Sequence, residues 1–261
     1  MIEIRNMTTS YGRGELFRVA GLTLKTGEIT AVIGRNGSGK STLLKTLAGF
    51  LKYQGSITIR SRECRDYSAR ERAREIAWLP QMLKTVQMDV ETLAEHGRYP
   101  HHGSTRRMGD ADREKVKEAL RMTGMEKMAK RSLQELSGGE RQRAYLAMVI
   151  AQDTPMILLD EPTTYMDLVY QKTFFEILQH LKQSGRGIVL SVHHLEQCFA
   201  FCDSICLMDQ RTLVRKATPE EWAKDTDTLR AVFGIEMKKT EDRELMYPYM
   251  IRRREEWLTF R

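Results

Sequence analysis

The chain has 261 residues, which allows one large domain or two modest ones with ample core. Lys and Arg number 42 against 35 Asp and Glu, so the formal charge is +7, an excess that favours anionic partners without selecting one. No stretch approaches the ~18 to 20 apolar residues of a membrane-spanning helix, and the N-terminus lacks the order of a signal peptide. We therefore expect a cytoplasmic chain whose four cysteines stay reduced.

The first sixty residues predict edge strands, a buried strand and a helix. Residues 2–28 and 55–60 alternate apolar and polar residues between glycines, which is typical of short antiparallel strands at a sheet edge. "ITAVIG" (29–34) is apolar and too short for a helix, so a buried strand fits. "STLLKTLAGF" (41–50) carries its apolar residues on one helical face, and Gly49 suits the helix end.

The strongest chemical signal lies between that strand and that helix. Residues 34–41, "GRNGSGKS", match the phosphate-binding pattern G-x-x-x-x-G-K-[ST] in the context that the pattern requires, which a chance glycine-rich turn would lack. The glycines let the backbone wrap a phosphate, Lys40 can reach the β- and γ-phosphates, and the Ser41 hydroxyl can ligate Mg²⁺. The predicted nucleotide-binding residues here are Gly34, Asn36, Gly37, Ser38, Gly39, Lys40, Ser41 and Thr42.

A second candidate anion site lies in the middle of the chain. Residues from about 90 to 152 read mostly as helix, which predicts a helical insert in an α/β core. Within this stretch, "ELSGGERQR" (135–143) places Ser137 before two glycines at a helix start, whose N–H groups can hold an anion. The alternative is a plain capped helix with Glu140 as the capping-box partner of Ser137, and one geometry can serve both purposes.

Acidic residues end the next predicted strand, "MILLDEP" (156–162). Asp160 at the strand end is suited to hold Mg²⁺ beside the phosphate loop. Glu161 should point toward the γ-phosphate, where it could polarise the attacking water as a general base. A strand that simply ends in acidic residues is the alternative interpretation.

The remaining elements complete an α/β pattern. "GIVLSV" (187–192) is a further buried strand, and the amphipathic segment 170–181 precedes it, as in a parallel sheet covered by helices. We expect a C-terminal helix at 218–235, followed by a tail at 236–261 of unknown role. Three evenly spaced cysteines are interpreted as buried free thiols rather than a metal site: Cys198, Cys202 and Cys206.

In this order, the motifs resemble those of an ABC-transporter ATPase subunit over roughly residues 1 to 235. The resemblance rests on the phosphate loop, Gln81, Leu136-Ser137-Gly138-Gly139-Glu140, Asp160-Glu161-Pro162, Asp167 and His193. "GRYPHHG" (97–103) and "DEPTTYMDL" (160–168) are similar to the subunits that import iron–siderophore, haem or cobalamin complexes.

The resemblance implies an α/β fold with a P-loop NTPase core, in which helices cover both faces of a mostly parallel sheet. It also implies an antiparallel β edge subdomain and an inserted helical subdomain. The implied single domain, 1–235, divides into a core at 1–88 and 153–217, a helical subdomain at 89–152 and the C-terminal helix.

The resemblance also implies roles for single residues around bound ATP and Mg²⁺. Tyr11 would stack on adenine, Gln81 would touch Mg²⁺ and the attacking water, and His193 would contact the γ-phosphate. Together with Lys40 and Glu161, Gln81 and His193 form the implied catalytic set, and the implied metal ligands are Ser41, Gln81 and Asp160. The alternative interpretations are that Tyr11 only packs in the core and that Gln81 is a surface residue after a strand. His194 stands where the family usually has Asp, so His194 stays an alternative to His193.

The family's ATPase subunits pair head to tail, so Ser137, Gly138 and Gly139 would bind the γ-phosphate of ATP held by a second copy. The implied partners are that copy, integral-membrane permease subunits and, indirectly, an external solute-binding protein, with no nucleic acid expected. The chain would then lie peripherally at the cytoplasmic face of the membrane, driving uptake of a ferric siderophore first and haem or cobalamin next. Two other function classes stay open: a soluble ABC ATPase of DNA repair or translation, and a nucleotide-binding regulator that does not hydrolyse ATP.

Overall fold

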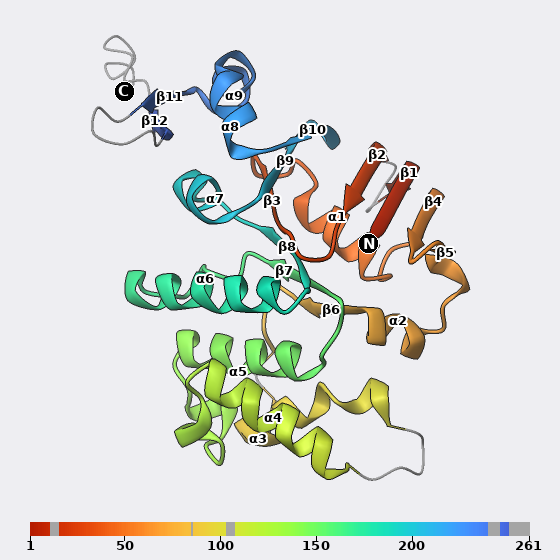
Figure 1. The fold of residues 1–261 in the computed structure, drawn as a ribbon, viewed down its shortest axis with the longest axis vertical. Helices are drawn as coiled ribbons and strands as arrows, with labels where there is room; N and C mark the ends of the chain where they lie inside the picture. The colour runs from red at the N-terminus through yellow and green to blue at the C-terminus, as the bar shows by residue number, and fades with distance from the viewer. Residues whose placement is uncertain (11–15, 85, 103–107, 240–245, 251–261) are drawn as a thin grey trace, which may run out of the picture.

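The structure is a computed structural model that describes residues 1–10, 16–84, 86–102, 108–239 and 246–250 (Figure 1). Its strands are β1 (Ile2–Ser10), β2 (Leu16–Leu24), β3 (Ile29–Gly34), β4 (Gln54–Ile59), β5 (Arg62–Glu63), β6 (Ile76–Leu79), β7 (Met156–Asp160), β8 (Gly187–Ser191), β9 (Ser204–Asp209), β10 (Thr212–Ala217), β11 (Ile235–Lys239) and β12 (Met246–Met250). Its helices are α1 (Lys40–Leu47), α2 (Ala69–Glu75), α3 (Val90–His96), α4 (Asp110–Met122), α5 (Gly138–Ala151), α6 (Leu168–Gln183), α7 (Leu195–Phe201), α8 (Pro219–Lys224) and α9 (Thr226–Phe233).

Ten of the strands form one mixed sheet in the order β5-β4-β1-β2-β10-β9-β3-β8-β7-β6. The half that contains β6, β7, β8, β3 and β9 is parallel, whereas β1, β2, β4 and β5 pair antiparallel. The two halves meet where β10 pairs with β2 at Thr212 and Arg18. The predicted fold class is therefore confirmed: a mostly parallel α/β core with an antiparallel β edge.

Helices cover both faces of the parallel half, as alternation along the buried strand β3 shows. Ile29, Ala31 and Ile33 point into one apolar core, whereas Val32 points into the other. Helix α1 packs its leucines on the Val32 side, and α6 packs Phe174 and other apolar residues on the opposite side. Because strands buried on both faces read as apolar runs, 29–34, 156–160 and 187–191 could be recognised from sequence.

The predicted helical segment contains α3, α4 and α5, which pack together at one end of the molecule (Figure 1). A buried ion pair joins the turn after α3 to α4, because Arg98 Nε donates to Asp112 Oδ1 at 3.0 Å. Arg98 Nη1 also donates to the carbonyl oxygen of Ala151, the last residue of α5, at 2.8 Å. One guanidinium group therefore ties the three helices together.

The C-terminal part differs from the expected single helix at 218–235. It forms α8 and α9, separated at Asp225, whose carboxylate caps α9 by accepting the N–H of Thr228 at 3.3 Å. The hairpin of β11 and β12 follows.

The three cysteines near β9 are buried and free, as predicted, and burial raises the pKa of the Cys202 and Cys206 thiols to about 12. Within the described ranges, no helix combines the length and apolarity needed to cross a membrane.

Candidate active site

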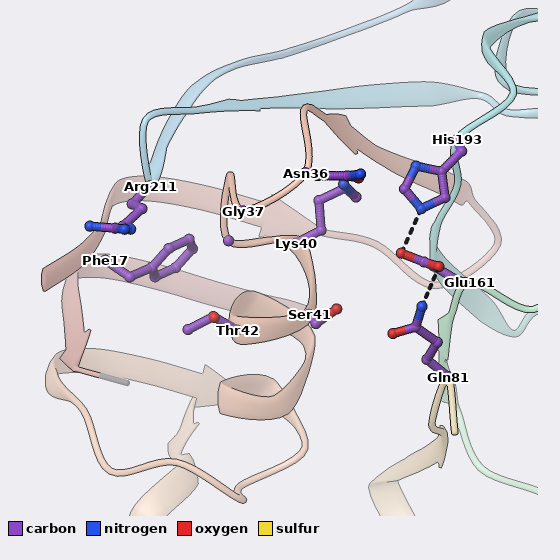
Figure 2. Close-up of a pocket in the computed structure, with 11 residues that line it drawn as sticks. Phe17, Asn36, Gly37, Lys40, Ser41, Thr42, Gln81, Glu161, His193 and Arg211 are labelled. Atoms are coloured by element: carbon purple, nitrogen blue, oxygen red, sulfur yellow. Dashed lines mark hydrogen bonds and ion pairs between the residues drawn. The ribbon is translucent and has the colours of Figure 1, made fainter. Parts of the chain in front are cut away.

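A cavity of about 690 Å³ opens at the edge where the parallel strands β3, β6, β7 and β8 end. Carboxyl ends of parallel strands meet at one edge, so residues far apart in the sequence come together there. The lining residues, shown in Figure 2, are Phe17, Asn36, Gly37, Gly39, Lys40, Ser41, Thr42, Gln81, Glu161, His193 and Arg211.

The loop between β3 and α1 has the geometry of an anion cradle. Gly37 and Gly39 have φ of 79° and 103°, and a Cβ on Gly39 would come within 2.5 Å of the Phe17 ring, so glycine is required there. Helix α1 begins without a side-chain cap, which leaves its first N–H groups for a ligand. The buried Ser38 hydroxyl has no hydrogen-bond partner among the described residues. A phosphate fits these groups.

Lys40 is buried at the start of α1 and folds back over the loop. Its Nζ donates to the carbonyl oxygen of Gly34 at 2.9 Å and to that of Arg35 at 3.3 Å. Burial lowers the pKa of Lys40, while the nearby Glu161 and Asp160 carboxylates oppose that shift. The ammonium group is thus a desolvated cation, which gains most when an anion enters the cavity.

Asp160 ends β7 with 1% of its surface exposed. Its Oδ1 accepts hydrogen bonds from Ser41 Oγ at 2.9 Å and from Ser191 Oγ at 2.7 Å. Its Oδ2 accepts none from the part of the chain that the structure describes. A hydroxyl and a carboxylate side by side are oxygen ligands of the type that Mg²⁺ prefers, so Ser41 and Asp160 fit this ion.

Glu161 presents its carboxylate between two of the predicted residues (Figure 2). Its Oε2 accepts from Gln81 Nε2 at 2.5 Å, and its Oε1 lies 2.6 Å from His193 Nε2. His194 does not line this cavity, so the geometry favours His193 over its neighbour. Three residues predicted from separate motifs therefore meet at one carboxylate group.

The Ser-Gly-Gly segment lies in a different cavity, of about 470 Å³, which Tyr165, Asp167 and Tyr170 also line. Here Ser137 Oγ accepts the N–H of Glu140 at 3.3 Å, and Glu140 Oε2 accepts the N–H of Ser137 at 2.8 Å. The predicted capping box is therefore present. Within one chain, the two candidate anion sites do not share a cavity.

Sequence reasoning missed three residues near the site. Phe17 and Arg211 line the end of the cavity opposite to Glu161 (Figure 2), and Ser191 contacts the two acidic residues at the end of β7, Asp160 and Glu161. Strand pairing, which the sequence does not state, places these three residues near the site. The one signal in the sequence is Ser191 itself, a polar residue in the otherwise apolar strand "GIVLS". Tyr11, predicted to stack on adenine, lies outside the described residues.

Comparison with known proteins gives consistent matches. The sequence model of the ABC transporter family matches residues 17–164. The petrobactin import ATP-binding protein FpuD of Bacillus anthracis is 37% identical over 244 residues, covering 92% of this chain and 89% of that protein. The iron(3+)-hydroxamate import ATP-binding protein FhuC of Bacillus subtilis is 35% identical over 235 residues, covering 89% and 87%. The hemin import ATP-binding protein HmuV of Pseudomonas putida is 35% identical over 260 residues, covering 97% and 100%.

Solved structures show the same fold. A chain of a transporter described as of metal-chelate type, in an inward-facing conformation, matches with a TM-score of 0.79 and 27% identity over 96% of each chain. A dimeric bacterial ABC transporter cassette matches with a TM-score of 0.74 and 25% identity, covering 84% of this chain and 99% of that one. The chain therefore belongs to the ABC transporter family, as one of its ATP-binding, ATP-hydrolysing subunits.

Proposed function

We propose that two copies of this chain pair head to tail around two ATP molecules and drive inward transport of a metal chelate through membrane permease subunits. A ferric siderophore is the first candidate cargo, and haem or cobalamin comes next. The observation that carries the hydrolytic part is the Glu161 carboxylate, held by Gln81 and His193 at 2.5 and 2.6 Å beside the phosphate loop. The names of the relatives, which import petrobactin, ferric hydroxamate and hemin, support the cargo.

In the proposed reaction, the ATP phosphates lie against the loop at 37–41 and Thr42, and the nucleoside extends toward Phe17 and Arg211. Lys40 leaves its carbonyl contacts for the β- and γ-phosphates. Glu161 accepts a proton from the attacking water, and His193 contacts the γ-phosphate. Ser41, Asp160 and Gln81 would hold Mg²⁺, which neutralises phosphate charge when it is bound.

The surface beside the Ser-Gly-Gly cavity supports pairing with a second copy. Tyr165, Leu168 and Val169 are 61, 83 and 81% exposed there, which is unusual for large apolar side chains in close sequence. The start of α5 gains from phosphate charge only if a phosphate reaches it. In a head-to-tail pair, that phosphate would be the γ-phosphate of ATP on the partner subunit's Lys40.

Three exposed apolar side chains, one of them next to Gln81 in the sequence, support a permease contact. Phe50, Met82 and Tyr99 are 65, 85 and 57% exposed. Two of them lie beside α2: Phe50 follows Gly49, which Arg72 of α2 contacts, and Arg70 and Arg74 of α2 donate to the carbonyl of Pro100, next to Tyr99. A permease segment with an apolar face would cover them and hold the chain at the cytoplasmic side of the membrane. The external solute-binding protein acts only through the permease.

For the domain organisation, we propose one ATPase domain over 1–235, with the core at 1–88 and 153–217 and the helical subdomain at 89–152. The positions of α3, α4 and α5, between residues 90 and 151, support the insert. The hairpin of β11 and β12 then belongs to the tail at 236–261, apart from its first residue.

Uptake in cells tests this function. In a strain that lacks this gene and any substituting paralogue, uptake of a labelled ferric hydroxamate siderophore should fall to background. Growth with this chelate as the sole iron source should be impaired, and excess free iron should restore it. A plasmid with the wild-type gene should restore uptake, and the Glu161→Gln gene should not. Unchanged uptake of ferric siderophore, haem and cobalamin would contradict the cargo, while phosphate release by the purified chain tests the ATPase independently.

A further inference from the structure

Ser191 is the last residue of β8, and its side chain contacts both Asp160, which ends β7, and Glu161, which follows it. The register of the two strands pairs Ser191 directly with Asp160. Its Oγ donates to Asp160 Oδ1 at 2.7 Å and accepts the N–H of Glu161 at 2.8 Å. Ser191 is fully buried in a strand that is otherwise apolar apart from its first glycine, where packing alone would favour an aliphatic side chain.

Each donor in this cluster has an acceptor. A serine hydroxyl has one proton, which goes to the carboxylate, and lone pairs, one of which accepts the Glu161 N–H. Asp160 Oδ1 accepts a second hydrogen bond from Ser41 Oγ at 2.9 Å. Two hydroxyl groups, one from α1 and one from β8, therefore fix the orientation of the Asp160 carboxylate by binding its Oδ1. Its Oδ2 accepts no hydrogen bond from the described residues.

The backbone at Glu161 depends on the same hydroxyl. Glu161 has φ of 49°, in the left-handed region, which is unfavourable for a residue with a side chain. Ser191 holds this turn by accepting the N–H, and Thr164 Oγ1 holds its other side by donating to the Glu161 carbonyl oxygen at 3.0 Å. This turn directs the Glu161 side chain toward Gln81 and His193.

We propose that Ser191 is a positioning residue for ATP hydrolysis, which fixes the Asp160 carboxylate and the Glu161 turn relative to each other through one hydroxyl. His193 follows Ser191 by two residues, just after the end of β8. The end of β8 therefore connects Asp160, Glu161 and His193. The inference rests on the roles proposed above for Asp160 and Glu161. Ser191 itself does not line the cavity, so it acts only through its neighbours.

Ser191→Ala should lower kcat by about 10- to 100-fold, the loss that corresponds to one hydrogen bond to a charged group. The affinity for ATP should stay within about twofold, because the phosphate loop is untouched. The Mg²⁺ concentration at half-maximal rate should rise, because Asp160 is less well oriented. Ser191→Thr keeps the hydroxyl and should recover most of kcat.

Ser204→Ala is the matched control. Ser204 is also a buried serine on a strand of the same sheet, and its hydroxyl contacts Glu28 and Thr30 far from the cavity, so kcat should be unchanged. A Ser191→Ala kcat within about twofold of wild type overturns the proposal. So does an equal loss in Ser204→Ala, or a Ser191→Thr variant as slow as Ser191→Ala. Glu161→Gln, measured alongside, separates the failures: full activity there refutes the proposed base instead.

Discussion

At the scale of single residues, the site is organised around the Glu161 side chain. One of its carboxylate oxygens accepts a hydrogen bond from Gln81, and the other lies 2.6 Å from His193 Nε2; these two residues follow β6 and β8. The positive φ of Glu161 turns the chain sharply after β7, so consecutive acidic residues point to different partners. Asp160 therefore stays buried with Ser41 and Ser191, while Glu161 faces the cavity.

The first prediction concerns this side chain. Glu161→Gln should leave ATP binding intact and lower turnover by about 10²- to 10⁴-fold, because the amide keeps the size of the side chain but cannot accept a proton. An ATP-bound dimer should then accumulate, visible as an earlier peak in gel filtration with ATP and Mg²⁺. Wild-type turnover in this variant would remove Glu161 from the mechanism.

At the scale of elements, the helical insert depends on a buried ion pair. Arg98 and Asp112 are each 8% exposed, and Arg98 also binds the end of α5. Burial raises the pKa of the Asp112 carboxyl, but the N–H of Gly109 and the Arg98 guanidinium lower it more, so the pKa lies below its ordinary value of 3.8. The unfolded chain therefore binds this proton more readily than the folded chain.

Asp112→Asn should lower the free energy of unfolding at pH 7 by about 2–3 kcal/mol, because the Arg98 charge stays buried without its counter-charge. The stabilisation from Asp112 is fully present above its ordinary pKa and is lost as pH falls through the folded pKa. The free energies of unfolding of wild type and variant, measured by urea titration, should therefore converge as pH falls from about 5 toward 3.

Asp110→Asn serves as the control, because the Asp110–Arg113 pair lies on the exposed surface of the same helix. Its free energy of unfolding should differ from that of wild type by less than about 1 kcal/mol, the contribution of an exposed pair and of a carboxylate in the first helical turn. A constant difference between wild type and Asp112→Asn across the acid range would contradict the assignment of this titration to Asp112.

Much of the fold could be predicted because its elements carry local signals. The apolar run of β3, the glycines before Lys40 and the Ser137–Glu140 spacing each encode a strand, a loop or a cap by themselves. The break between α8 and α9 was missed because Asp225 interrupts a segment with no glycine or proline at that point. Ser191 was missed because its role depends on the register with β7, which the sequence does not state.

At the scale of the whole molecule, the two candidate anion sites lie in separate cavities of one chain. The phosphate loop, Glu161 and His193 line one cavity, and Ser137 lies in another. A head-to-tail pair would bring the second site of each copy onto the first site of its partner, giving two composite sites related by symmetry. ATP would then stabilise the pair, and hydrolysis would release it.

The arrangement of lesions in a linked dimer tests this central claim most directly. Lys40→Ala disables the phosphate loop, and Ser137→Arg blocks the other half-site, since a large side chain replaces the hydroxyl at the helix start. Two copies of the chain are joined by a flexible linker, with the substitutions either on different copies or together on one copy beside a wild-type copy. Phosphate release is then measured for both linked dimers.

Composite sites predict that lesions on different copies fall in one shared site, so the other site stays intact and about half of the wild-type activity remains, if the sites work independently. Lesions on one copy damage both sites, so activity should be lost. The reverse result, activity with both lesions on one copy and none when they are separated, would mean that each chain forms its own complete site and would contradict the account.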